Sequence, residues 1–344
     1  MQEYLPLVVT DIRTETPGIK RITFITQSGE ILPYKAGQFI SFPVSQDQKD
    51  LRRSYSFVSA PETGEPMQIA VKRIDNGLFS RKLHDHIKPG DVLYSTGASG
   101  MFTLPEKAEQ YSCYCFFAAG IGITPVLSLM KAALNSTQAK LVLFYSNRSV
   151  ADTAFYNEIE HLQTLYSHRL QVIYLFSSSP NLRMARLNKE LVPRLVEKYV
   201  PEPHGALFYT CGPYAYMRMV IYALEEMNIP RAHIRKENFD TTVTTFKPQP
   251  PDKAAHTVFF QQEGKHYSFI TQFPNTILQA AEKQGLSLPY SCRNGVCGAC
   301  AARCTDGMVW HSANEVLTDK ELANGIILTC CSYPVYGDIH MTLL

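Results

Sequence analysis

Four cysteines near the C-terminus have the spacing of a ligand set for an iron–sulfur cluster. Cys292, Cys297 and Cys300 form a C-x4-C-x2-C run, and Cys330 follows further along the chain. This is the plant-type [2Fe–2S] pattern, in which four thiolates bind two irons. A zinc site and buried free thiols are the alternatives, but zinc sites usually show two short C-x2-C pairs and only one such pair occurs here. The spacing therefore predicts a [2Fe–2S] cluster.

The fourth ligand has a competitor, because Cys331 is adjacent to Cys330. The spacing favours Cys330, and a neighbour on a strand would point its side chain to the opposite face. Gly295 and Gly298 would let the backbone bend around inorganic sulfide and let N–H groups donate to the sulfurs. Cys304 is expected to be structural, since a free cysteine often packs as a small apolar residue.

A second set of residues is suited to a flavin. Arg53-Ser54-Tyr55-Ser56 lies on a predicted strand. Arg53 could neutralise a phosphate, Tyr55 could pack on the isoalloxazine or the ribityl chain, and Ser56 could hydrogen-bond the flavin near N5. A half-buried strand with a surface arginine is the alternative reading of these four residues.

Further candidate flavin contacts lie just downstream. Gly77 and Ser80 would be at the N-terminus of a short helix predicted for Leu78 to His86, where a pyrophosphate can bind. A simple helix cap is the commoner role of a serine at such a place. The other candidates in this region are Val71, Lys72 and Phe79.

A glycine turn indicates a dinucleotide site. The run Gly120-Ile121-Gly122-Ile123-Thr124-Pro125 follows an apolar strand and opens a helix, a position at which a pyrophosphate can bind. Proline replaces the third glycine of the usual fingerprint, and proline suits a first helical turn. A turn needed only for packing is the alternative. We expect Gly120, Gly122, Thr124 and Pro125 to contact the dinucleotide.

The end of the next strand bears on the choice between NADPH and NADH. An NAD site of the usual type has an acidic residue here to bind the ribose hydroxyls. This chain has Ser146 and Arg148 instead. Arginine fits a phosphate well, so the pair favours the 2′-phosphate of NADPH, with NADH as the alternative. A solvated loop arginine is the other reading.

The elements that must position these residues change along the chain. Residues 1–106 contain short β-rich segments separated by turn signals, which predicts an antiparallel six-stranded β-barrel. Residues 107–245 alternate strands and helices, which predicts an α/β domain with a parallel sheet. Residues 246–255 are rich in proline and read as a linker. Residues 256–344 are expected to form a small α+β domain, with a helix from Asn275 to Gln284 and Asn275 as its N-cap.

Together these motifs resemble the ferredoxin–NADP reductase superfamily, followed by a plant-type ferredoxin domain of β-grasp fold. The resemblance implies that R-x-Y-[ST] and the later G-x-x-S hold FAD, with FMN as the alternative. It implies that Cys211, in Cys211-Gly212-Pro213, helps to place C4 of the nicotinamide. It also implies that Glu237 orients a serine or the nicotinamide, and that Phe239 lies near the flavin. Ser56, Cys211 and Glu237 are therefore the candidate catalytic residues.

The domain order resembles the reductase components of multicomponent oxygenases, of the phenylacetyl-CoA epoxygenase and phthalate dioxygenase types. Benzoate-type reductases have the ferredoxin domain first. The resemblance implies that electrons pass from NAD(P)H through the flavin and the cluster to a protein acceptor, expected to be an oxygenase component. A reductase for a desaturase or haem protein, and a redox sensor without steady turnover, are the alternatives.

Composition argues against several other classes. The net charge of the 344 residues is +2, too near zero to indicate a nucleic-acid partner. No stretch of about eighteen apolar residues occurs, so no membrane span is expected. Four of the nine cysteines crowd between Cys292 and Cys304, which does not suit a secreted disulfide scaffold. We therefore expect a cytoplasmic protein.

Overall fold

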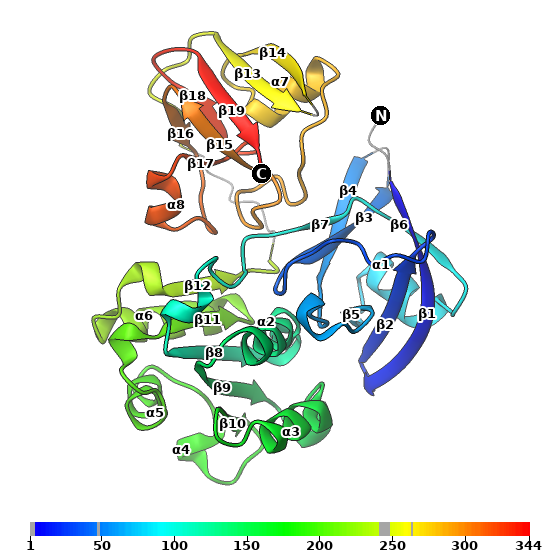
Figure 1. Ribbon diagram of the computed structural model, residues 1–344, viewed down its shortest axis with the longest axis vertical. Helices are drawn as coiled ribbons and strands as arrows, with labels where there is room; N and C mark the ends of the chain where they lie inside the picture. Colours follow the sequence, from blue (N-terminus) through cyan, green and yellow to red (C-terminus); the bar gives the residue numbers. More distant parts are fainter. Residues whose placement is uncertain (1–3, 47–48, 241–247, 263) are drawn as a thin grey trace. The chain divides into compact units, whose positions relative to one another are not determined.

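The computed structural model, which describes residues 4–46, 49–240, 248–262 and 264–344, contains two units (Figure 1). The first runs from Tyr4 to Phe239, and the second includes Asp240–Leu344. None of the helices in the described ranges is long and apolar enough to cross a membrane.

The first unit begins with two antiparallel sheets that share one core. Their strand orders are β5-β2-β1-β6 and β4-β3-β7, and a bridge between Phe57 and Ile69 connects them. Side chains at alternate positions, such as Leu7 and Val9, point into the core. The strands are β1 (Leu5–Thr16), β2 (Ile19–Thr26), β3 (Phe39–Gln46), β4 (Lys49–Ser56), β5 (Met67–Lys72), β6 (Val92–Ser95) and the two-residue β7 (Ala98–Ser99). The predicted barrel is confirmed.

A parallel sheet of strand order β10-β9-β8-β11-β12 follows in the same unit. Its strands are β8 (Cys113–Ala119), β9 (Lys140–Asn147), β10 (Leu170–Phe176), β11 (Leu207–Cys211) and β12 (Ile234–Glu237). Its helices are α2 (Ile123–Ser136), α3 (Tyr156–Leu165), α4 (Leu182–Ala185), α5 (Leu191–Tyr199) and α6 (Tyr214–Glu226). The predicted α/β architecture is therefore confirmed.

Strand β8 is buried on both faces, as expected for a central strand of a parallel sheet. Tyr114 and Phe116 pack in one apolar cluster with α2 and α3. Cys115 and Phe117, at the alternate positions, pack in a second cluster with α5 and α6. The helices thus cover both faces of the sheet (Figure 1).

The order of the strands determines where a ligand can bind. From β8 the chain adds β9 and β10 on one side, and then β11 and β12 on the other. Ligands of open α/β sheets bind at such a reversal, at the carboxyl ends of the strands. The reversal here lies between β8 and β11, so the turns after these two strands are the natural binding site.

The second unit is built on a mixed sheet of strand order β14-β13-β19-β15-β17, with β16 and β18 as a small separate pair. Strands β13 and β19 are parallel and the other pairs are antiparallel. The strands are β13 (His256–Gln262), β14 (Lys265–Thr271), β15 (Ala301–Asp306), β16 (Val309–His311), β17 (Ile326–Leu328), β18 (Ser332–Pro334) and β19 (Ile339–Leu343). Its helices are α7 (Ile277–Lys283) and α8 (Asp319–Ala323).

Two local predictions need comment. The expectation that Asn275 caps the helix of the second unit is wrong, because Thr276 is the cap and forms a capping box with Gln279. Residues 248–255 of the predicted linker contain no helix or strand, and residues 246–247 lie outside the described part. Asp252 accepts hydrogen bonds from the backbone N–H groups of Ala254 and Tyr336, so this segment is tied to the second unit.

Candidate functional site

The candidate flavin strand is β4, which pairs with β3 and ends at Ser56. Alternation along a strand places Arg53 and Tyr55 on one face and Ser56 on the other. The Arg53 side chain is exposed, so its guanidinium is available to a phosphate, whereas Ser56 is buried. The strand thus offers a cation and a ring side by side.

The Tyr55 ring lies in an aromatic cluster. Its centroid is 6.2 Å from that of Phe42 and 6.2 Å from that of Phe79, and Phe42 and Phe79 are 5.8 Å apart. Burial raises the pKa of Tyr55 to about 12, so the phenol is neutral at physiological pH. Such a fixed, neutral aromatic surface suits packing against a flavin.

Gly77 and Ser80 make a tight turn at the start of α1 (Leu78–Arg81), which continues as a π-helical segment to His86. The Ser80 hydroxyl donates to the Gly77 carbonyl at 3.0 Å and accepts from the Ile74 N–H at 3.4 Å. A Cβ on Gly77 would lie 2.4 Å from Ser80 Oγ, so any larger residue here would displace the Ser80 hydroxyl. Because the Ser80 hydroxyl is already hydrogen-bonded within the turn, a pyrophosphate bound here would accept hydrogen bonds mainly from backbone N–H groups.

The other two predicted contacts in this region differ in exposure. Val71 is buried in the barrel core, and Lys72 is exposed at the end of β5. A cofactor could therefore contact Val71 only through its backbone. The roles of both residues stay predictions.

The glycine turn after β8 packs directly against the turn after β11. A Cβ on Gly122 would lie 2.3 Å from the Cys211 carbonyl oxygen, and one on Gly212 would lie 2.9 Å from Ala119 Cβ. Gly120 has φ +54, and no atom lies within 4 Å of where its Cβ would be. Gly120 therefore leaves open space at the strand reversal, where a pyrophosphate could approach the backbone closely.

Thr124 and Pro125 lie in the first turn of α2 and are buried. The Thr124 hydroxyl donates to the Ile121 carbonyl at 3.0 Å. A ligand could therefore reach the backbone N–H of Thr124 more readily than its side chain.

Three candidate catalytic residues from two domains meet at the same end of the sheet. The Ser56 hydroxyl donates to Glu237 Oε1 at 3.3 Å. Glu237 ends β12 and is paired in register with Cys211, which ends β11. Burial, together with the nearby Glu237, raises the pKa of the Cys211 thiol well above its usual value. Cys211 is therefore a neutral thiol rather than a nucleophile.

The remaining nicotinamide-site candidates surround this point. Ser146 pairs in register with Ala119, the residue before the glycine turn, and Arg148 is exposed just beyond β9. Pro213 is the N-cap of α6, and Phe239, two residues after Glu237, is 43% exposed. These positions are compatible with the predicted contacts, whose roles stay predictions.

The four cluster cysteines converge in the second unit. The Cys330 thiol is within hydrogen-bonding reach of Cys292 and Cys300, and Cys292 is also within reach of Cys297. Hydrogen bonds from Cys292, Cys300 and Cys331 lower the pKa of Cys330. Contacts with Cys297 and Cys330 raise the pKa of Cys292, and the contact with Cys330 raises the pKa of Cys300. Four sulfurs this close together, three from one loop and one from a distant turn, fit a [2Fe–2S] cluster.

Backbone N–H groups point at these sulfurs. The Asn294 N–H donates to Cys292 Sγ at 3.4 Å, and N–H groups of Gly295 and Ala299 bond to the sulfurs of Cys330 and Cys297. Such donors stabilise the charge of thiolate ligands and of sulfide. The loop therefore provides the backbone donors that a set of thiolate ligands needs.

Cys331 has a different environment from Cys330. Its sulfur donates to the Ala313 carbonyl at 2.8 Å, and a Cβ on Gly295 would lie 3.0 Å from it. Strand alternation was expected to point Cys330 and Cys331 to opposite faces. That expectation is wrong, because both cysteines lie in a turn between β17 and β18 rather than on a strand. Cys304 is half-buried on β15 and donates to the Asp306 carbonyl at 3.2 Å.

Within the described ranges, no three His, Cys, Asp or Glu side chains are arranged to hold a single metal ion. A two-iron cluster divides its four ligands between two irons.

One supporting residue of the cluster loop was not predicted from the sequence. Arg293 has φ +59, forms two hydrogen bonds to Glu282 of α7 at 2.7 and 2.8 Å, and stacks 3.9 Å from the Tyr290 ring. These contacts hold the loop in its strained conformation. In the sequence, only the charge of Arg293 beside the candidate ligand Cys292 could have indicated this supporting role, since its partner Glu282 lies on another element.

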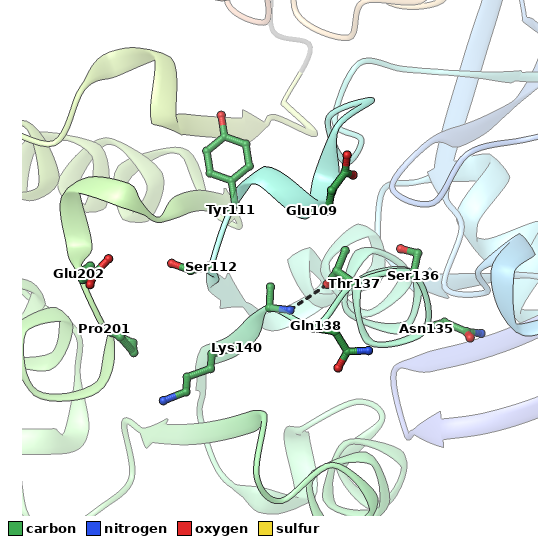
Figure 2. Close-up of a pocket in the computed structure, with 11 residues that line it drawn as sticks. Glu109, Tyr111, Ser112, Asn135, Ser136, Thr137, Gln138, Lys140, Pro201 and Glu202 are labelled. Atoms are coloured by element: carbon green, nitrogen blue, oxygen red, sulfur yellow. Dashed lines mark hydrogen bonds between the residues drawn. The ribbon is translucent and has the colours of Figure 1, made fainter.

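A pocket of about 580 Å³ lies at the amino ends of strands β8 and β9, whereas the candidate site lies at the carboxyl ends of the strands (Figure 2). Tyr111, Ser112 and Lys140, at the starts of β8 and β9, line it together with Pro201. No predicted site residue is among its lining residues, so this pocket is separate from the candidate site.

Three family models match successive parts of the chain. The oxidoreductase FAD-binding domain matches residues 6–104, and the oxidoreductase NAD-binding domain matches residues 116–221. The 2Fe-2S iron-sulfur cluster binding domain matches residues 260–335. The three cofactor classes expected from the motifs are therefore confirmed.

Relatives of known activity match over nearly the full length. One of the subunits of 1,2-phenylacetyl-CoA epoxidase from Escherichia coli is 30% identical over 98% of this chain and 97% of its own. The ferredoxin reductase component of 3-ketosteroid-9-alpha-monooxygenase from Rhodococcus rhodochrous is 31% identical over 96% of this chain and 94% of its own.

Solved structures agree on the fold. Phthalate dioxygenase reductase matches with a TM-score of 0.59 and 22% identity over 99% of this chain and 98% of its own. A type IV self-sufficient cytochrome P450 monooxygenase matches with a TM-score of 0.73 and 24% identity over 98% of this chain. The chain spans only 41% of that larger protein.

Proposed function

The chain belongs to the ferredoxin–NADP reductase superfamily with a C-terminal [2Fe–2S] domain, and from this membership we propose that it passes electrons from NADPH through FAD and the cluster to an oxygenase component. The observation that carries the proposal is the end-to-end match to the ferredoxin reductase component of an oxygenase, 31% identical over 96% of the chain. The convergence of Ser56, Glu237 and Cys211 at the strand reversal supports it.

The barrel residues hold and orient the flavin in this proposal. Arg53 neutralises a phosphate, the Tyr55 cluster supports the ring system, and the turn at Gly77 receives the pyrophosphate through its N–H groups. FAD, when bound, accepts two electrons from the nicotinamide and releases them singly to an iron–sulfur cluster. Ser56, kept in place by Glu237, provides the hydrogen bond at the reacting edge of the flavin.

The nicotinamide residues orient the donor. The N–H groups at Gly120 and Gly122 hold the pyrophosphate, and the neutral, buried Cys211 places the nicotinamide by contact. Because the thiol is not ionised, it positions the ring and does not attack it. No dedicated catalytic base is needed, since these residues act through position and electrostatics.

Steady electron transfer to a protein acceptor tests the proposal against a redox sensor. We expect NADPH to drive continuous reduction of cytochrome c by the purified holoprotein, and Cys297→Ser to abolish it while reduction of ferricyanide at the flavin persists. Reduction that stops after one equivalent would indicate a sensor instead. Reconstitution with a purified oxygenase component, rather than with a desaturase or haem protein, identifies the acceptor class.

The preference for NADPH rests on Arg148 and on the absence of an acidic residue at the end of β9. We expect Arg148→Ala to lower kcat/KM for NADPH by roughly tenfold or more, because charged hydrogen bonds contribute about 1.5–3 kcal/mol, and to leave NADH turnover unchanged. Equal losses with both nucleotides would contradict this specificity.

We place the protein in the cytoplasm. None of the nine cysteines, all of which lie in the described ranges, forms a disulfide, which suits a reducing compartment. Immunodetection after fractionation of cells that produce the protein tests this, and recovery in an oxidising compartment would contradict it.

A further inference from the structure

Hydrogen bonds and ion pairs from one face of α2 hold the nicotinamide domain against the flavin barrel, and these contacts are the fastenings of α2. Ser128, Lys131 and Asn135 recur at helical spacing, so they share a face of α2. Asn135 Nδ2 donates to the Glu62 carbonyl of the barrel at 2.6 Å. The other two residues make the more deeply buried contacts.

Lys131 is the centre of an ion network that crosses between the two domains. Its side chain is only 6% exposed and contacts Glu65 of the barrel at 3.0 Å and Glu158 of α3 at 2.7 Å. Glu158 also pairs with Arg21 of β2, which is 2.7 Å from Glu15 of β1. Positive and negative groups alternate along the network, so each buried charge has opposite charges beside it.

Ser128 makes an uncharged fastening one helical turn away. It is fully buried, donates to the Ser59 carbonyl at 2.6 Å and accepts from the Gly37 N–H at 3.1 Å. Gly37 has φ +86, and a Cβ on it would lie 2.0 Å from the Phe102 carbonyl oxygen and 2.9 Å from Leu129 Cδ2 of α2. The barrel backbone is therefore packed closely onto this face of the helix.

These fastenings connect the two halves of the candidate site through one rigid element. Ser59, which bonds to α2, is three residues after Ser56 in the chain. The first turn of α2, beginning at Ile123, follows directly on the Gly120 turn. Any shift of α2 on the barrel therefore shifts the Gly120 turn relative to Ser56.

We propose that α2 sets the spacing between the nicotinamide and the flavin, with Ser128 and Lys131 as positioning residues for hydride transfer. This inference rests on the proposed function. In the step concerned, the C–H bond at nicotinamide C4 would break, and a bound flavin would take up the hydrogen with its electron pair at N5, so that NADPH would become NADP⁺ as the flavin gained two electrons. Loosening α2 misplaces C4 without removing any contact to either cofactor.

The test compares Lys131→Met and Ser128→Ala with Lys189→Met. Lys189 pairs with Glu226 at 2.9 Å within the nicotinamide domain, and both side chains are close to half exposed, so its loss leaves the fastenings intact. Rapid mixing with NADPH and with its 4-deuterated form gives the limiting rate of flavin reduction, its isotope effect and the Kd of NADPH. Lys131→Arg serves as the conservative rescue.

We expect Lys131→Met and Ser128→Ala to slow flavin reduction by about tenfold or more, because a misplacement of about 1 Å can cost roughly a hundredfold. The Kd of NADPH and the flavin content stay within about twofold of wild type, and the isotope effect changes, since only the geometry of transfer is altered. Lys189→Met and Lys131→Arg stay near wild type. Unchanged limiting rates in both fastening variants would overturn the proposal.

Calorimetry of the flavin-free protein tests the fastening independently of chemistry. We expect the barrel and the nicotinamide domain to unfold in one transition in wild type and in two transitions in Lys131→Met. A shared transition in both fastening variants would overturn the inference. If wild-type flavin is not reduced by NADPH or NADH, the proposed function fails, and the calorimetric result still decides whether α2 couples the domains.

Discussion

Cys330 and Cys331 are adjacent in the chain, but their sulfur atoms have different neighbours. The sulfur of Cys330 lies within hydrogen-bonding reach of Cys292, Cys300 and Cys331, whereas that of Cys331 contacts Cys330 and also donates to the Ala313 carbonyl. We predict that Cys330→Ser loses the visible absorption and the reduced-state EPR signal of the cluster, while Cys331→Ser retains both. Retention of an unaltered signal in Cys330→Ser would contradict the ligand assignment, and iron and sulfide analysis of both variants provides the control for loading.

The contact between Ser56 and Glu237 makes a second prediction at this scale. Ser56 donates to the carboxylate at 3.3 Å, so Glu237→Gln weakens the hold on the serine. We expect the rate of flavin reduction by NADPH to fall roughly tenfold or more, because a hydrogen bond to a charged group contributes about 1.5–3 kcal/mol. Flavin content serves as the control, and an unchanged rate with full flavin content would show that Glu237 is dispensable.

Residue types and spacing were enough to name ligand candidates, because the chemistry of a cluster or a phosphate restricts which side chains can bind it. They did not predict the directions in which these side chains point. The Thr124 hydroxyl turns inward to Ile121, and Cys331 turns to Ala313. Each orientation depends on a carbonyl from another part of the backbone, which spacing in the sequence does not encode.

At the scale of elements, the turns after β8 and β11 depend on close packing. A Cβ on Gly122 would lie 2.3 Å from the Cys211 carbonyl oxygen, whereas a Cβ on Gly205 would meet nothing within 4 Å. We predict that Gly122→Ala lowers the free energy of unfolding of the first unit by about 1–3 kcal/mol, as overpacking typically does, and weakens NADPH binding. Gly205→Ala is the matched control, and equal effects of the two changes in denaturant unfolding would contradict the role of close packing.

The ion pairs of Glu158 predict how the stability of the fold depends on pH. Burial alone would raise the pKa of Glu158, but Lys131 and Arg21 more than offset this, so its pKa lies below the ordinary value of 4.5. The carboxylate therefore stabilises the fold above pH 4.5, and this contribution is lost as the pH falls through the folded-state pKa. We expect Glu158→Gln to be less stable than wild type by a constant amount from roughly pH 6 to 8, with the difference shrinking in acid. Thermal unfolding at each pH measures this, and a difference that grows in acid would contradict the sign.

Element boundaries were predicted with mixed success. Strand and helix alternation predicted the order of elements in the α/β domain, since apolar period and turn residues are local signals. The cap of α7 was placed on Asn275 rather than Thr276, because both residue types can cap and only the bond to Gln279 decides. The fastening of α2 by Lys131 was not foreseen, since its partners Glu65 and Glu158 are distant in sequence.

At the scale of the whole molecule, three cofactor domains are joined in one chain. The order of the FAD-binding, NAD-binding and cluster-binding matches along the sequence indicates an internal path with the cluster at its exit. A flavin between the other two groups is needed because nicotinamide gives two electrons and a [2Fe–2S] cluster accepts one. This electron path therefore requires the flavin to be reduced before the cluster.

Anaerobic rapid mixing of the holoprotein with NADPH tests this order most directly, with flavin absorption and the reduced-cluster EPR signal followed on the same samples. We predict that flavin absorption falls first, that the cluster signal then rises, and that Cys330→Ser shows only the first phase. A cluster that stays oxidised beside a reduced flavin, or a cluster reduced before any change in the flavin, would contradict this electron path.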